Sequence, residues 1–195
     1  MNRRVMAVTA AAVMSMSSFV VPAMADEEEV VSIQITTPLM SMDPLIGGDA
    51  TNTTVISNTM EGLFVVDADG QIQNGLCDSY EVSDDQKTYT FHIRDNAKWS
   101  DGTPVTAQDF AYAWKRNATA EGDYSTFTYQ IEMAAIKNYE EVTSGEADAD
   151  ELGVTAVDDN TLKVELEYPV PFFLNLLTFS PWAPVKESKL TEEGD

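Results

Sequence analysis

Residues 88–94 constrain the fold most, because apolar and polar side chains alternate there without a break. Tyr89, Phe91 and Ile93 would face one side, and the residues between them would face the other. This alternation predicts a half-buried strand in an antiparallel sheet. Helix and hairpin patterns surround the strand, so we expect a mixed α+β fold.

Turn residues and apolar spacing predict the remaining elements. Thr106 would cap a helix, with Asp109 at its third position in a short-armed capping box. Thr51 or Asn52 would cap an earlier helix that ends near Met60. We expect further strands at 30–36, 63–66, 80–82, 154–157 and 162–166, further helices at 125–142 and 172–179, turns at 67–70, 84–87, 100–102 and 158–160, and an extended exit at 181–184.

The first 25 residues have the pattern of a secretory signal. Arg3 and Arg4 precede an uncharged apolar stretch over 5–21, and Ala-Met-Ala at 23–25 forms a small-x-small cleavage site. A membrane anchor is the alternative, although the stretch is at the short limit for a span. We expect cleavage after Ala25 and a protein located in a periplasm or outside the cell, without the cysteine needed for lipid attachment.

Charge and cysteine content exclude several classes of partner. The 195 residues include 33 acidic and 11 basic side chains, for a formal net charge of −22. Nucleic acids and anionic membrane surfaces are therefore unlikely partners, because both are bound through Lys and Arg. Cys77 is the single cysteine, so no intrachain disulfide can form, and we expect a buried thiol.

Motifs for catalysis, metals and cofactors are missing from the sequence. His92 is the single histidine and cannot form a His-rich metal site. Residues 67–70 lack the later ligands of a calcium loop and predict a hairpin turn. The glycosylation patterns at Asn52 and Asn117 are best read as chance matches. We expect no catalytic residue, no metal ligand and no cofactor, although carboxylates are too numerous for a catalytic pair to be excluded by counting.

A long motif adds a family resemblance. Residues 75–110, which contain the run Lys-Trp-Ser-Asp-Gly-Thr-Pro at 98–104, resemble the signature region of the extracellular solute-binding proteins of family 5. Members of this family are the oligopeptide-binding proteins of ABC importers. Further similar stretches lie at 42–44, 61–64, 151–166 and 168–173, so the resemblance spans about residues 33–186. The same motif residues also have a structural reading, since they turn the chain and cap a helix.

The resemblance implies a fold of the periplasmic-binding-protein type II kind, present only in part. We expect a signal peptide at 1–25, the first strand region of one lobe at 26–60, a smaller inserted β-rich domain with helices at 61–168, and a return segment toward the first lobe at 169–195. The chain would then be the N-terminal fragment of a longer receptor and would form at most one wall of its cleft. Such receptors close their lobes over the ligand by a hinge motion.

The resemblance also implies a function and three binding residues. Family members hold extended oligopeptides through main-chain hydrogen bonds and deliver them to membrane permease subunits. Tyr124 matches a tyrosine that touches peptide, and the loop 47–50 matches a segment that lines the cleft. Gly48 stands where the family has an acidic residue, so Gly48 and Ala50 can offer backbone contacts alone. We expect a monomer.

Other functions stay open from the sequence alone. A receptor of the same fold could take a nickel chelate or an oligosaccharide, because specificity depends largely on the opposing lobe. A secreted hydrolase would need a nucleophile motif or a metal cluster, and a surface adhesin would need repeats or an anchoring tail; neither pair of features is present in the sequence.

Overall fold

The computed structural model describes residues 32–39, 41–45, 49–120 and 128–193, and it divides the chain into two units, 1–34 and 35–195. The expected secretory signal lies outside the described residues. In the first unit, residues 32–34 are in neither helix nor strand. Among the described residues, no helix has the length and apolar character needed to cross a membrane.

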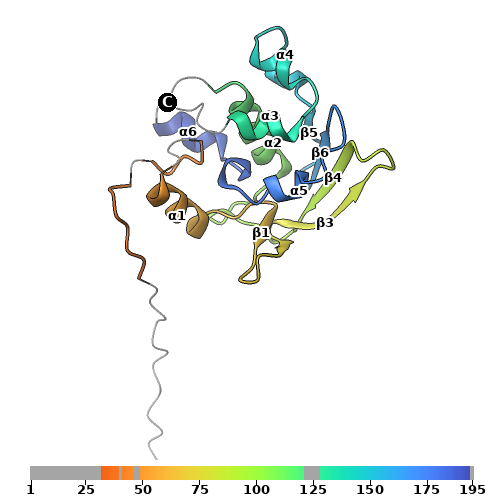
Figure 1. Ribbon diagram of the computed structural model, residues 1–195. Coiled ribbons are helices and arrows are strands. Elements are labelled where there is room, and N and C mark those ends of the chain that lie inside the picture. The colour runs from red at the N-terminus through yellow and green to blue at the C-terminus, as the bar shows by residue number, and fades with distance from the viewer. Residues whose placement is uncertain (1–31, 40, 46–48, 121–127, 194–195) are drawn as a thin grey trace, which may run out of the picture. The chain divides into compact units, whose positions relative to one another are not determined.

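The second unit contains a four-stranded sheet in which every neighbouring pair is antiparallel (Figure 1). Its strands, in spatial order, are β3 (Cys77–Val82), β4 (Thr88–Ile93), β6 (Thr161–Glu165) and β5 (Val154–Ala156). The alternation predicted for β4 is confirmed, because Tyr89, Phe91 and Ile93 are buried and the residues between them are half-buried. The predicted hairpin of β5 and β6 is confirmed as well, with Val154 opposite Val164.

A separate two-stranded hairpin joins β1 (Phe64–Val66) to β2 (Ile72–Asn74). Its turn has the chemistry expected for 67–70: Asp67 Oδ1 accepts hydrogen bonds from the backbone N–H groups of Asp69 and Gln71, at 2.9 and 2.8 Å. Gly70 has a φ of 76°, which glycine adopts without strain. The sequence gives no sign of β2, since Ile-Gln-Asn has little strand pattern.

Helix α2 (Ala107–Ala118) packs on β5 and β6. It begins as predicted, with Asp109 Oδ2 accepting from the backbone N–H of Thr106 at 2.8 Å. Phe110 and Trp114 lie on its fully buried face, and Trp114 Nε1 donates to the carbonyl of Trp182 at 3.0 Å.

The remaining helices are α1 (Ala50–Thr59), α3 (Thr128–Ala134), α4 (Tyr139–Thr143), α5 (Phe173–Leu176) and α6 (Glu187–Glu193), with 3₁₀ turns η2 (Ala149–Glu151) and η3 (Ser180–Trp182).

The single helix expected at 125–142 is wrong. Helix α3 ends at Ala134 and α4 begins at Tyr139, and between them Ala135 and Asn138 have left-handed φ values of 50° and 61°. The chain leaves the helix in order to pair with the end of β6: the N–H of Lys137 donates to Glu165 at 2.9 Å. Backbone hydrogen bonds to the sheet replace those of a continuous helix.

Smaller corrections concern the ends of other elements. The strand expected at 30–36 is not formed in its described part, 32–36, because a strand needs a paired neighbour as well as suitable residues. Helix α1 is capped by Asp49 instead of Thr51 or Asn52. The exit expected to be extended at 181–184 contains η3, and α6 follows it. The domain boundaries expected at 60 and 168 stay predictions.

Most of the buried hydrophobic side chains of the second unit form one cluster that runs from Leu63 to Val185. Aromatic rings link its parts, with Phe173 of α5 centred 4.8 Å from Tyr89 of β4. Asn52 and Asn117 are both 0% exposed, so neither can accept a glycan. The two glycosylation patterns are therefore chance matches, as expected.

Candidate functional site

The three residues assigned to ligand binding by resemblance lie next to helix ends. Ala50 is the first residue of α1 and is exposed. Gly48 precedes the capping residue Asp49, and Tyr124 follows the end of α2; both lie outside the described residues. The described residues on either side of the segments 46–48 and 121–127 in the sequence give the geometry of this region.

A bidentate ion pair joins the loop at 41–45 to the last turn of α2. The guanidinium of Arg116, in the last turn of α2, donates from Nη1 and Nη2 to Asp43 Oδ1 and Oδ2 at 3.0 and 2.6 Å. The side chains are only 16% and 9% exposed. Asp43 Oδ1 also accepts from the N–H of Leu45 at 3.0 Å, which fixes the loop in front of residue 46. The loop at 41–45 and the C-terminal turn of α2 are therefore held together by a largely desolvated pair.

Buried polar residues also gather beside these two segments. In the described part of the chain, the polar side chains classed as buried are Thr51, Asn52, Asn117 and Gln130. The first two follow segment 46–48, and the other two flank segment 121–127. Within the described ranges, both amide atoms of Asn117 and the Oε1 atom of Gln130 have no hydrogen-bond partner. Buried polar groups are rare away from functional or structural networks. The sequence around segments 46–48 and 121–127 is therefore a candidate for a functional role.

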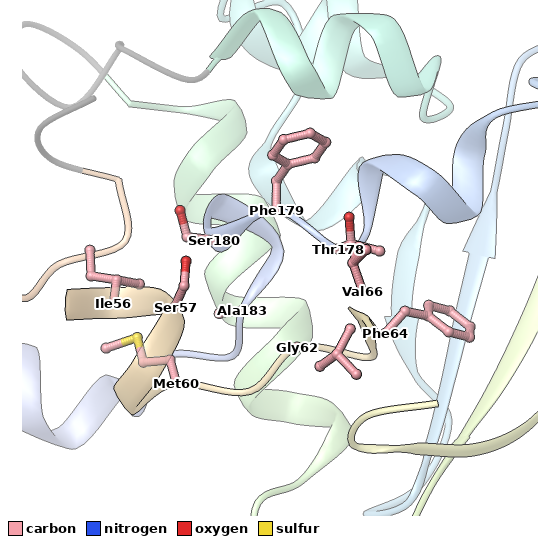
Figure 2. Close-up of a pocket in the computed structure, with 11 residues that line it drawn as sticks. Ile56, Ser57, Met60, Gly62, Phe64, Val66, Thr178, Phe179, Ser180 and Ala183 are labelled. Atoms are coloured by element: carbon pink, nitrogen blue, oxygen red, sulfur yellow. The ribbon is translucent and has the colours of Figure 1, made fainter. Parts of the chain in front are cut away.

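A hollow of about 260 Å³ lies where α1 meets β1 and the segment 178–183. Figure 2 shows side chains from all three around it, including Ile56, Phe64 and Phe179. Ser57 and Ser180 contribute hydroxyl groups, and none of the lining residues is an acid, a base or a thiol. The hollow can hold a molecule by apolar contact and hydrogen bonds, but its lining offers no group for proton transfer.

Two further hollows lie on the same unit. One, of about 480 Å³, is lined by Glu61, Arg94, Lys98 and Trp99 among others. The other, of about 360 Å³, is lined by four glutamates and two tyrosines. Among the described residues no group of three or more His, Cys, Asp or Glu side chains is arranged to hold a metal ion.

Groups with shifted pKa values have structural explanations. Burial raises the pKa of the Cys77 thiol to about 11, so this cysteine stays protonated and unreactive. The ammonium of Lys186 and the hydroxyl and N–H of Thr103 hold the pKa of Asp101 well below its ordinary value. This cluster ties the segment before α6 to the turn after Trp99.

Sequence reasoning missed the Asp43–Arg116 pair. Asp43 belongs to the motif at 42–44, and Arg116 is a basic residue in the last turn of a predicted helix, where it complements the helix dipole. The two residues are 73 positions apart. No local pattern connects residues at that distance, so only three-dimensional structure reveals the contact.

Comparison with known proteins identifies the family to which the chain is similar. The model of the bacterial extracellular solute-binding proteins, family 5 (middle), matches residues 71–195. The oligopeptide-binding protein OppA of Bacillus subtilis is 43% identical over 163 residues, which are 84% of this chain and 29% of that protein. The periplasmic murein peptide-binding protein MppA of Escherichia coli is 40% identical over 77% of this chain and 28% of its own length.

Solved structures agree with the sequence matches. The unliganded open form of MppA superposes with a TM-score of 0.73 at 39% identity, over 80% of this chain and 30% of that one. Listeria monocytogenes OppA bound to peptide gives 0.73 at 35% identity, over the same shares. The chain thus spans about 30% of the length of these relatives, and the expected fold class, a mixed helix-and-sheet part of a periplasmic binding protein, is confirmed. The chain belongs to the bacterial extracellular solute-binding proteins of family 5.

Proposed function

We propose that this chain is part of the substrate-binding component of an ABC importer and forms one wall of a cleft for extended oligopeptides. The observation that carries the proposal is its 43% identity to the oligopeptide-binding protein of Bacillus subtilis. The structural similarity to a Listeria protein bound to peptide supports the same ligand class. Delivery of the peptide to membrane permease subunits follows from the family.

Within this proposal the peptide lies along the segments at 47–50 and around Tyr124. Ala50 and Gly48 offer backbone groups, which meet the main chain of any peptide in the manner of an added strand. Tyr124 contributes ring contact and a hydroxyl. The Asp43–Arg116 pair joins the loop at 41–45 to the last turn of α2, at 2.6–3.0 Å, and so limits the freedom that binding must remove.

The protein would act outside the cytoplasm, as a monomer, without catalysis or a cofactor. Its leader supports export, and its relatives include proteins named as periplasmic. The site described above contains hydroxyl, amide and ion-paired groups, which suit recognition. Release of intact peptide after incubation, measured by mass spectrometry, would support a binding protein, whereas cleaved peptide would contradict it.

A chimera gives the direct test of peptide binding. Residues 33–195 would replace the matching part of Bacillus subtilis OppA, and binding of tetra-alanine would be measured by calorimetry. We expect affinity within about tenfold of the parent, since main-chain contacts tolerate sequence change. In this chimera Tyr124→Ala should weaken binding by about tenfold, the effect of one lost aromatic contact, and Tyr129→Ala, an exposed tyrosine of α3, is the matched control. A folded chimera that ignores tetra-alanine would refute the proposal.

A non-peptide ligand is the second candidate. The probable deoxycholate-binding periplasmic protein YgiS of Escherichia coli is 37% identical over 80% of this chain, nearly as similar as the peptide-binding relatives. The same chimera would be titrated with deoxycholate in the presence and absence of tetra-alanine. Tight binding of deoxycholate without any response to tetra-alanine would favour this candidate over the first.

A further inference from the structure

The largest of the three hollows, about 480 Å³, has walls of mixed chemistry. We call it the basic hollow and define it by Leu76, Arg94, Lys98, Trp99 and Val105, together with Met42, Thr59, Met60, Glu61, Ser100 and Pro184. Leu76 and Val105 are each 5% exposed and form part of the hydrophobic core, so they give the hollow an apolar floor. Its volume falls in the range of small-molecule sites, about 300–1,000 Å³.

Backbone and side-chain contacts hold Lys98 and Trp99 of the basic hollow in place. Lys98 forms an antiparallel bridge with Pro104, which holds its backbone in place. The indole N–H of Trp99 donates to Asp109 Oδ2 at 3.2 Å, the same carboxylate that caps α2. The ring of Trp99 is therefore anchored at its polar atom. An anchored aromatic ring is a surface on which a ligand can pack with little loss of side-chain freedom.

The charges of the basic hollow do not balance. Arg94 is bonded to Glu61 by two contacts, at 2.7 and 3.4 Å, so these two charges neutralise each other. The side chain of Lys98 is exposed and makes no ion pair or hydrogen bond with the other described residues. The hollow thus has a net positive charge in a chain whose formal net charge is −22. A local reversal of sign of this kind favours an anion at this place over the rest of the surface.

We propose that the basic hollow binds a small amphipathic carboxylate, separately from the peptide site. The carboxylate meets the ammonium of Lys98, and the apolar body packs on Trp99 and on the floor formed by Leu76 and Val105. Ala50, the one described residue among the three assigned to peptide binding, does not line this hollow. A free organic acid and the C-terminal residue of a short peptide share this chemistry, and the experiment below separates them.

Intrinsic fluorescence of the full chain provides the measurement. Trp114 and Trp182 are 0% exposed, so a ligand in the basic hollow would act on the emission of half-buried Trp99. The probes are 4-phenylbutyrate, N-acetylphenylalanine and the neutral amide of each. We expect saturable changes with the acids and none with the amides. A response to both acids indicates general carboxylate binding, and a response to N-acetylphenylalanine alone assigns the source to peptide C-termini; equal responses to acids and amides would overturn the proposal.

Variants of Lys98 test the role of its charge. Lys98→Gln should lower the affinity for the two acids by about three- to fivefold, the effect of one solvent-exposed charge contact. Lys98→Arg should keep the affinity within about twofold, because the positive charge is retained. Lys163→Gln is the matched control, since Lys163 lies on β6 with a 40% exposed side chain and outside the hollow. Thermal melting checks that each variant folds. Unchanged affinity in Lys98→Gln, or equal loss in Lys163→Gln, would overturn the assignment.

Discussion

At the scale of single residues, the pair formed by Asp43 and Arg116 is the most consequential contact near the proposed cleft. Its side chains are 9% and 16% exposed, so removing one partner leaves a poorly solvated charge behind. We expect Asp43→Asn to lower the free energy of unfolding by about 3 kcal/mol, the size typical for breaking a buried pair. Urea denaturation of the full chain measures it.

A matched pair on the surface serves as the control for this prediction. Lys163 and Glu165 are 3.3 Å apart with side chains about 40% exposed. Lys163→Gln should cost less than about 1 kcal/mol, because water screens exposed pairs. Similar losses in the two variants would mean that burial adds nothing to the Asp43–Arg116 contact.

The buried amide of Asn117 gives a prediction of opposite sign. It is 0% exposed, and in the part of the chain that the structure describes neither its oxygen nor its nitrogen has a hydrogen-bond partner. Replacing it by leucine, which has a similar shape, should raise the free energy of unfolding by about 1–3 kcal/mol, the desolvation cost of an unpaired polar group. Asn52→Leu is the control: Asn52 is equally buried but is not without an interaction partner, so that variant should lose stability. A less stable Asn117→Leu protein would show that the amide has a partner in solution.

Local chemistry at the residue scale was predictable where cause and effect lie close in sequence. The cap at Thr106 and Asp109 and the turn at 67–70 both follow from neighbours within a few positions. The buried thiol of Cys77 was expected because this cysteine is the single one in the chain and has no partner to pair with. The Asp43–Arg116 pair did not follow, because nothing in either local sequence specifies its partner. The ligand roles of Gly48, Ala50 and Tyr124 come from the resemblance and stay predictions.

At the scale of elements, the break between α3 and α4 shows how tertiary pairing overrides a helical pattern. The N–H of Lys137 donates to the backbone carbonyl of Glu165, and the N–H of Gly153 donates to the backbone carbonyl of Lys137 at 2.8 Å. Gly153 allows this approach, since a Cβ there would lie 2.6 Å from the Glu165 oxygen and 2.8 Å from the Lys137 Cβ. Periodicity predicted β4 and the β5–β6 hairpin correctly because their burial pattern matches the pleat. It failed at 135–138, where the bonds to the sheet leave no periodic signal.

This close approach predicts a strong effect of Gly153→Ala. The added methyl group would press on backbone atoms that cannot move without breaking the sheet contact, and we expect a loss of about 2–3 kcal/mol in the free energy of unfolding. Gly145→Ala is the control, because Gly145 has a φ of 77° and open space around it. Its loss should be about 1 kcal/mol, from backbone strain alone. Chemical denaturation compares the two, and a smaller loss at Gly153 would contradict the packing argument.

The link between the segment before α6 and the turn at 100–103 should make stability depend on pH. Lys186 and Thr103 hold the pKa of Asp101 below its unfolded value, so the folded state favours the charged carboxylate. This contribution is present above the unfolded pKa of about 3.9 and is lost as the pH falls below it. We expect Asp101→Asn to be less stable at pH 7 and to lose less on acidification.

Denaturation curves between pH 7 and pH 2.5 provide the measurement. Asp84→Asn is the control, because exposed Asp84 has no ion pair among the described residues. Its curve should run parallel to that of the unchanged protein. If Asp101→Asn loses stability on acidification as steeply as the unchanged chain, the Lys186 contact does not account for the dependence.

At the scale of the whole molecule, the fold class was predictable because a long motif identified the family, and not because patterns specified the packing. Composition and periodicity alone reached a mixed α+β protein. The resemblance added a periplasmic-binding fold, and the superposition on solved relatives confirmed it. The expected division at residue 168 has no such support, and the packing suggests a test of it.

The packing across residue 168 predicts that the described part of the second unit unfolds as one cooperative body. Phe173 and Trp182 follow this boundary, yet Phe173 packs on Tyr89 at a ring distance of 4.8 Å and Trp182 packs edge-on to Trp114 at 4.8 Å. All four belong to one buried cluster, so neither side keeps a core without the other. Urea unfolding should therefore give coincident curves by circular dichroism and by tryptophan fluorescence.

Phe173→Ala should shift both curves together by about 3 kcal/mol, the usual cost of a buried Phe→Ala change, with exposed Phe172→Ala as the control. Two separate transitions, or a shift in the fluorescence curve alone, would instead place a real domain boundary near residue 168.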